Sequence, residues 1–185
     1  MSHFIHITGA SGSGVTTLGR NLARATGAVQ LDTDDFYWDS AAPKFTRKRD
    51  VADRLSLLRA AMNDAKSRGW ILSGSIGTWG APLVPDISLV IYLGTPTDVR
   101  LSRLRNREAA EFGQEAVSPG GSRYDNFRDF IDWASHYESG TREGRSRQMH
   151  EAFLAGLSCP VLRLEGTAPP EELVIRVLEF LKAPR

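Results

Sequence analysis

The stretch HITGASGSGVTTLGRNLA, His6–Ala23, runs from a short apolar segment through a glycine-rich loop into a helical pattern. It matches the phosphate-loop pattern G-x-x-x-x-G-K-[ST] at Gly9, Gly14 and Thr16, but position 15 carries valine instead of lysine. The glycines allow tight turns that point backbone amides at one anion, and the helix that follows adds its positive end. The stretch therefore predicts a phosphate site that has lost its lysine.

Most of the groups that would bind the phosphates are present although the lysine is missing. We expect the loop to bind phosphate through residues Gly9, Ser11, Gly12, Ser13, Gly14, Val15, Thr16 and Thr17. Thr16 holds the position whose hydroxyl binds Mg²⁺ in this motif. The missing charge-assisted contact costs roughly 1.5–3 kcal/mol of binding, which weakens the site without abolishing it. Either an arginine elsewhere replaces the lysine, or the protein binds without catalysing transfer.

A dinucleotide site is the rival interpretation of the same glycines. The pattern G-x-G-x-x-G fails here, because from Gly12 and Gly14 the third glycine would fall at Thr17. An accidental glycine-rich turn is the remaining alternative. The strand-like segment before the loop and the helix after it favour the phosphate loop.

The rest of the chain predicts an α/β fold. Apolar segments predict β-strands at 3–8, 28–32, 70–74, 87–94 and 159–166. Helical patterns occupy 16–25, 50–69, 97–113, 127–137, 146–157 and 169–182, and the stretch 114–126 predicts a flexible loop. The alternation predicts a parallel sheet covered by helices on both faces. We expect one domain over 1–185, with an insert after the second strand and a lid region at about 105–145.

Composition narrows the functional classes. The net charge is +1 and no basic stripe or stacking motif stands out, so nucleic-acid binding is not expected. The longest apolar run, near 89–93, is far too short to span a membrane, and the N-terminus has no signal-peptide pattern. A cytoplasmic protein is the default expectation, as a monomer or a homodimer.

An acidic cluster follows the second predicted strand. Asp32, Asp34 and Asp35 would lie at the carboxyl end of a parallel strand, where open α/β sheets bind ligands. If the strand continues, alternation places Asp32 and Asp34 on one side and Asp35 on the other. Such carboxylates can hold hydrated Mg²⁺ or accept a proton from an attacking hydroxyl. Helix capping or a solvated turn is the alternative.

The loop, the D-T-D sequence at 32–34 and the glycine-marked third strand resemble the nucleoside monophosphate kinase and shikimate kinase superfamily. The chain is most similar to small bacterial adenylate-kinase-like or topology-modulation-like ATPases, in which the loop lysine is often replaced. This resemblance implies a parallel sheet of order 2-3-1-4-5 that binds ATP and Mg²⁺. It places Asp32 with Thr16 at the metal, Asp34 near the acceptor hydroxyl, and Gly166 at the adenine. DDFY at 34–37 also resembles uridine kinases, which leaves the base open between Asp34 and Asp35.

The third predicted strand ends in LSGSIGTWG, 72–80, whose small residues match the acceptor pocket of shikimate-type kinases. An acidic Walker B residue is missing at this strand's end, so we expect Asp32 to take that duty. A plain turn is the alternative.

Arginines are the candidates to replace the lysine. Arg100, Arg103 and Arg107 share one helix face, and the resemblance places such arginines in a lid over the phosphates. A second group of arginines lies where the chain returns after the lid region, at Arg142, Arg145 and Arg147. We name Asp34, Arg103, Arg107 and Arg145 as candidate catalytic residues. A solvated basic helix face is the alternative for any such run.

These features predict a kinase that transfers the γ-phosphoryl group of ATP to a small acceptor molecule. The second hypothesis is a nucleotide-binding switch or weak NTPase in which Val15 explains the loss of turnover. The acceptor and the arginine that compensates stay open.

Overall fold

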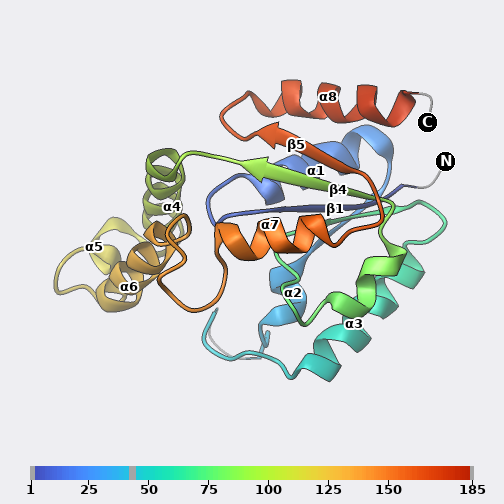
Figure 1. Cartoon of the computed structure of the whole chain (residues 1–185). Coiled ribbons are helices and arrows are strands. Elements are labelled where there is room, and N and C mark those ends of the chain that lie inside the picture. The colour runs from blue at the N-terminus through green and yellow to red at the C-terminus, as the bar shows by residue number, and fades with distance from the viewer. Residues whose placement is uncertain (1–2, 42–44, 184–185) are drawn as a thin grey trace.

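The computed structural model describes residues 3–41 and 45–183, and in this part of the chain five parallel strands form one sheet (Figure 1). The spatial order is β2-β3-β1-β4-β5, which confirms the predicted fold class. The strands are β1 (Phe4–Gly9), β2 (Val29–Asp32), β3 (Trp70–Ser73), β4 (Leu89–Gly94) and β5 (Val161–Glu165). Gly9 pairs with Leu93, and Asp32 with Ser73, so the phosphate loop and the acidic cluster leave the sheet at the same edge.

Helices cover both faces of the sheet, as the alternating pattern predicts. The larger helices are α1 (Val15–Thr26), α3 (Val51–Asp64), α4 (Thr97–Phe112), α6 (Tyr124–Ser135), α7 (Arg147–Ala155) and α8 (Pro170–Lys182). Helices α1 and α8 lie on one face, while α3 and α7 lie on the other (Figure 1). Gly27 ends α1 in the left-handed conformation, at φ 75°, where its N–H donates to the carbonyl of Ala23.

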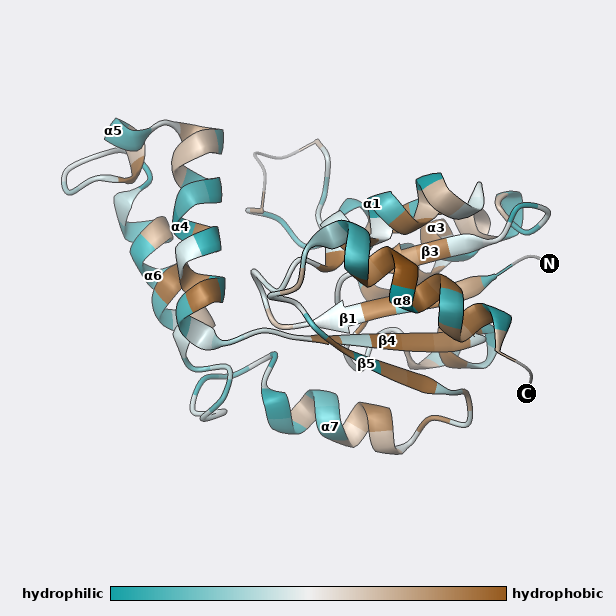
Figure 2. Ribbon diagram, turned by 90° about the horizontal axis from the view of Figure 1, so that it is seen from above, coloured by the Kyte–Doolittle hydropathy of each residue, from teal (hydrophilic) through white to brown (hydrophobic). Residues whose placement is uncertain are grey.

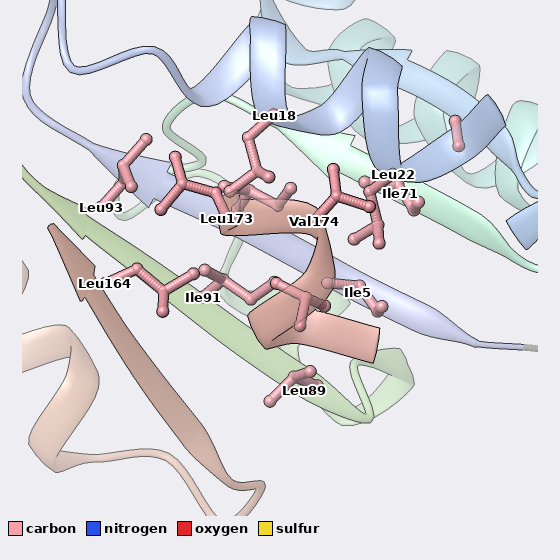
Figure 3. Close-up of a cluster of buried hydrophobic side chains, with 13 residues drawn as sticks. Ile5, Leu18, Leu22, Ile71, Leu89, Ile91, Leu93, Leu164, Leu173 and Val174 are labelled. Carbon is pink, nitrogen blue, oxygen red and sulfur yellow. The ribbon is translucent and has the colours of Figure 1, made fainter. Parts of the chain in front are cut away.

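Two apolar cores explain why the inner strands are apolar on both sides. Alternate side chains of β1 and β4 point to opposite faces, and Figure 3 shows Ile5, Ile91 and Leu93 packed with Leu18 and Leu173 from α1 and α8. The second core, on the α3 and α7 side, includes Leu58, Leu72, Val90 and Leu154. Burying one such side chain stabilises the fold by about 1.5–3 kcal/mol, so the two cores hold the loop-bearing edge rigidly.

Three short helices differ from the sequence-based expectation. Residues Thr33–Tyr37 form helix α2 directly after β2, and Ala81–Asp86 form a 3-10 helix, η1. Residues Gln114–Val117 form helix α5 inside the stretch predicted as a flexible loop. The strand therefore ends at Asp32, and the predicted alternation of Asp32, Asp34 and Asp35 along a longer strand is wrong. Asp32 caps the new helix instead, because its Oδ1 accepts from the N–H of Asp34 at 3.1 Å.

Helices α4, α5 and α6 project from the sheet beyond the carboxyl ends of the strands (Figure 2). They pack on one another, and the chain then returns through residues 137–146 to α7. The projecting unit falls in the region expected to be a lid. Within the described ranges, every helix is too short or too polar to cross a bilayer.

The second core contains two buried histidines. His6 on β1 is fully buried, with Nδ1 at 3.1 Å from the carbonyl of Leu72, and His150 on α7 is 5% exposed. Burial lowers the pKa of His6 to about 4, and burial together with Arg145 and His6 lowers the pKa of His150 to about 4. Both imidazoles are therefore neutral in the folded protein at pH values where the unfolded chain already binds protons.

We predict that the protein loses stability as pH falls from about 6.5 to about 4. The unfolded state binds more protons across this window, so the free energy of unfolding rises with pH and falls on acidification. A shift from 6.5 to about 4 corresponds to a maximum of about 3 kcal/mol for each histidine. His6→Asn keeps a donor at the place of Nδ1 for the carbonyl of Leu72 without a titrating group, so urea unfolding should give it a shallower dependence on pH than wild type. Equal slopes for the two proteins would refute this origin of the acid sensitivity.

Candidate functional site

The phosphate loop is a tightly packed turn between β1 and α1. Gly12 and Gly14 have left-handed φ angles of 82° and 102°, and the N–H of Ser13 donates to the carbonyl of Ala10 at 3.1 Å. A Cβ at Gly9 would lie 2.6 Å from the carbonyl oxygen of Leu93, and one at Gly12 would lie 2.6 Å from that of Arg100. The glycines are therefore needed for close packing as well as for the turn.

Val15 begins helix α1, and its partly buried side chain packs against the first apolar core. The position that carries lysine in the motif is thus committed to packing. Thr17, two residues further on, is exposed, and the loop hydroxyl of Ser11 accepts a hydrogen bond from another segment. A positive charge for this loop must come from elsewhere in the chain.

Thr16 and Asp32, the two predicted metal ligands, are in direct contact. The hydroxyl of Thr16 donates to Asp32 Oδ2 at 2.8 Å. Ser73 occupies the end of β3, and its hydroxyl lies 3.4 Å from the same carboxylate oxygen. The carboxylate of Asp32 therefore lies beside the loop threonine. The end of β3 contributes only the hydroxyl of Ser73 to this site.

These residues fit Mg²⁺ better than a metal that needs a full protein cage. Mg²⁺ is commonly bound by one or two carboxylates, with waters and substrate phosphates as its other ligands. Among residues 3–41 and 45–183, no group of three or more His, Cys, Asp or Glu side chains converges on a point. The Thr16 and Asp32 oxygens supply a hard, partly exposed anchor of the kind that a phosphate-bound Mg²⁺ requires.

Asp34 lies on the first turn of α2, close to several charges. Asp34 as a whole is exposed, but atoms packed around its carboxyl partly desolvate that group and raise the pKa of Asp34, and the neighbouring charge of Asp32 raises it further. The positive charges of Arg145 and Arg107 and a hydrogen bond from Trp38 oppose this rise. A carboxylate with a raised pKa is a better proton acceptor near neutral pH.

Asp35 has a similar environment but different cationic neighbours. Partial burial and Asp32 raise the pKa of Asp35, while Arg20 on α1 opposes the rise. In the described part of the chain, none of the arginines of residues 100–147 contributes to the shift in the pKa of Asp35. Of the two aspartates, Asp34 is therefore the one that interacts with Arg107 and Arg145.

Arg145 lies in the segment that follows the projecting helices in the sequence, and it places a cation beside the phosphate loop. Its Nη1 donates to Ser11 Oγ at 3.2 Å. Burial lowers the pKa of Arg145, and the charge of Asp34, the largest opposing influence, raises it. Since a guanidinium stays protonated in proteins, this side chain is a partly desolvated positive charge between the phosphate loop and Asp34.

The arginines of α4 separate into different roles. Arg100 is fully buried, and its guanidinium donates to the carbonyls of Ser11 and Ala134 at 3.3 Å each. It supports the loop from behind and is not free to meet a ligand. Arg107 is exposed, pairs with Glu108 at 3.0 Å, and lies 5.8 Å from the ring centre of Phe130.

Arg103 bridges the phosphate loop and the segment after β5. Its Nη1 donates to the carbonyl of Ser13 at 3.3 Å and to that of Gly166 at 2.9 Å. A Cβ at Gly166 would lie 2.7 Å from the carbonyl of Ser13, so the two segments touch through their backbones. Gly166, expected at the adenine, thus stands directly beside the phosphate loop, with Arg103 over the junction.

One residue that the sequence reasoning missed lies against Tyr37 at the end of α2. Arg54 on α3 is only 8% exposed, its Nε donates to the carbonyl of Arg49 at 2.7 Å, and its guanidinium lies 4.0 Å from the ring centre of Tyr37. Trp79 is its second aromatic neighbour, at 5.9 Å. Arg54 lies four residues before Leu58, on the same face of the helix as the other buried residues. This spacing is the signal that could have indicated a buried arginine.

Comparisons with known proteins agree with this architecture. A family model described as AAA domain matches residues 5–118. The chain is 43% identical, over 183 residues and 99% of both sequences, to a Bacillus subtilis (strain 168) protein named "Uncharacterized protein YqaC".

Two solved kinases share the fold. A sugar kinase from Janibacter sp. HTCC2649 superposes with a TM-score of 0.51 at 21% identity, over 98% of this chain and 95% of that one. A shikimate kinase from Bacteroides thetaiotaomicron gives a TM-score of 0.52 at 20% identity, over 98% and 99%. The family match covers the phosphate loop, Asp32, β3 and the whole of α4, and the fold shared with the two kinases spans the chain. The chain therefore belongs to the AAA domain family, and its fold is shared with these two kinases.

Proposed function

We propose that the protein is an ATP-dependent phosphotransferase that moves the γ-phosphoryl group of ATP to a small acceptor. The observation that carries this proposal is the convergence of Arg145, Ser11 and Asp34. A cation, an anion-binding loop and a carboxylate with a raised pKa are the groups that phosphoryl transfer to a hydroxyl requires. A site that only retained nucleotide would have no use for Asp34.

Each group has a defined task in the proposed reaction. The loop amides and the start of α1 bind the phosphates, and Thr16 and Asp32 would hold a Mg²⁺ ion, which would neutralise part of the phosphate charge. Arg145 faces the outer phosphates and replaces the missing lysine. Arg107 contributes further positive charge near Asp34, and Arg103 with Gly166 lies where the base would emerge.

Transfer then requires an acceptor hydroxyl beside Asp34. The hydroxyl oxygen forms a bond to the γ-phosphorus, while the bond from that phosphorus to the β,γ-bridging oxygen breaks and its electron pair leaves with ADP. The proton of the hydroxyl passes to the carboxylate of Asp34, whose raised pKa favours this step. Arg145 stabilises the charge on the transferring group.

The walls of the acceptor side suggest the chemistry of the acceptor. Tyr37 and Trp79 supply aromatic surface, and Arg54 supplies a buried cation against the Tyr37 ring. This combination supports a small acceptor that carries an anionic group, bound with that group toward Arg54. The second hypothesis, a switch with little turnover, is supported by Val15 alone.

We predict that Arg145→Ala lowers turnover well beyond its effect on nucleotide binding. Removing the cation should cost about 10²-fold in kcat, because charge on the transferring group is then uncompensated. Release of ADP, measured with an acceptor found by screening anionic and neutral hydroxyl compounds, reports the loss. Arg142→Ala is the matched control, since Arg142 lies in the same segment but pairs with Asp132 of α6. Equal losses for both variants would show that Arg145 has no special role.

We predict that Asp34→Asn abolishes most of the transfer, by about 10²–10⁴-fold, and leaves MgATP binding intact. Wild-type turnover should fall on acidification as Asp34 becomes protonated, at a pH above the ordinary pKa of an aspartate. Asp35→Asn, one residue away, should retain activity and the same pH profile. If Asp35→Asn is the inactive variant instead, the base is Asp35 and the role given to Asp34 is wrong.

A further inference from the structure

A chain of buried polar side chains lies behind the phosphate loop, outside the site described above. It begins at Thr8, the residue before Gly9, whose Oγ1 is 3.3 Å from His150 Nε2. His150 Nδ1 is 2.7 Å from the hydroxyl of Tyr137, which is 3.0 Å from the hydroxyl of Tyr92. All four residues are less than 10% exposed. Hydrogen-bonded polar groups in such surroundings fix one geometry, because breaking any link leaves a buried group unpaired.

The proton pattern of this chain is determined by the neutral state of His150. Burial, Arg145 and His6 lower the pKa of His150 to about 4, so one ring nitrogen donates and the other accepts. Burial raises the pKa of Tyr137, which keeps its proton. A consistent arrangement has Tyr92 donating to Tyr137, Tyr137 to Nδ1, and Nε2–H to Thr8.

Tyr137 also fixes the segment that carries Arg145. Its carbonyl accepts the N–H of Arg147 at 2.9 Å, which closes residues 138–146 into a loop with both ends held together. Ser146 caps α7 by accepting from the N–H of Met149 at 3.2 Å, so the second end continues directly into the helix of His150. The side chain of His150 and the backbone of Arg147 therefore both clamp Tyr137.

The same tyrosine contacts the back of the phosphate loop through Arg100. The Arg100 guanidinium lies 5.1 Å from the Tyr137 ring centre and donates to the carbonyl of Ser11 at 3.3 Å. Arg145 approaches Ser11 from its hydroxyl side at 3.2 Å. One loop residue is thus held between two arginines, and Tyr137 fixes the elements that present both.

We propose that Tyr137 and His150 are positioning residues that hold Arg145 over the phosphate loop and so make the site prefer a nucleoside triphosphate to a diphosphate. This inference rests on the proposed function, because it needs Arg145 to meet the outer phosphate. The polar atoms of both side chains bond to each other, to Thr8 and to Tyr92. Their hydrogen bond sets where the end of the 138–146 loop lies, and the position of the Arg145 charge follows from it.

The test compares the affinities of wild type and variants for MgATP and MgADP by calorimetry. Arg145→Ala should lower the preference for ATP over ADP by about tenfold or more, since it removes a charge-assisted contact to the third phosphate. Tyr137→Phe keeps the ring under Arg100 and removes only the hydroxyl. It should lower the same preference by at least about threefold with ADP affinity unchanged, because a looser loop presents its charge less well.

The double variant separates positioning from general destabilisation. If Tyr137 acts through Arg145, adding Tyr137→Phe to Arg145→Ala should change the preference no further. Tyr124→Phe on α6, away from the chain of polar groups, is the control and should behave as wild type. Circular dichroism melting identifies a temperature at which every variant is folded, and all titrations are made there.

A second pair of variants isolates the bond between His150 and Tyr137. The amide of asparagine reaches the place of Nδ1, whereas that of glutamine reaches the place of Nε2. His150→Asn should therefore keep more of the ATP preference than His150→Gln, which retains only the contact to Thr8. Additive losses in the double variant, equal effects of Asn and Gln, or a matching loss of ADP affinity in Tyr137→Phe would each overturn the inference. Absence of nucleotide binding by wild type would instead overturn the proposed function, and the inference with it.

Discussion

The contact between Arg145 and Ser11 joins two segments that are far apart in the sequence and places a cation at a phosphate loop that has none of its own. Val15 packs against the core beneath α1, so this loop cannot supply the charge locally. Much of the remaining structure fixes the position of this charge. The projecting helices α4 to α6 carry the chain away from the sheet, and α7 brings it back.

A charge held in this way needs compensation, since removing a guanidinium from water is costly. The charge of Asp34 is the largest influence that raises the pKa of Arg145, and the charge of Arg145 in turn opposes the rise in the pKa of Asp34. The cation and the proposed base are thus coupled: each is stabilised in its charged form by the other. A lysine on the loop itself would lie next to the phosphates whatever the position of helices α4 to α6. The position of an arginine from residues 138–146 depends instead on where the chain leaves these helices. This dependence makes the buried contacts of Tyr137 and His150 important for a site that they do not touch.

The sequence was sufficient to predict the sheet, its helices and the loop, because period-two and period-3.6 patterns and glycine spacing are local signals. The pairing of Thr16 with Asp32 followed from the resemblance and from the shared edge of parallel strands. The roles of the individual arginines did not follow. Arg100, Arg103 and Arg107 share one helical spacing, yet Arg100 is buried against backbone carbonyls while Arg107 is exposed, since the first turn of α4 lies under the loop and the later turns project beyond it. Helix α2 was missed because a capping aspartate and a strand-ending aspartate look alike in sequence.

Calorimetric titration of ATP, with and without Mg²⁺, into wild type and Val15→Lys tests most directly whether the chain has replaced its lysine. We expect wild type to bind MgATP, with weaker binding when Mg²⁺ is absent. The lysine variant should bind no more tightly, because its side chain leaves an apolar contact and adds a charge to a site that Arg145 already serves. No binding by wild type, together with binding restored by the lysine, would mean that Arg145 does not perform this role and that the loop no longer holds a nucleotide.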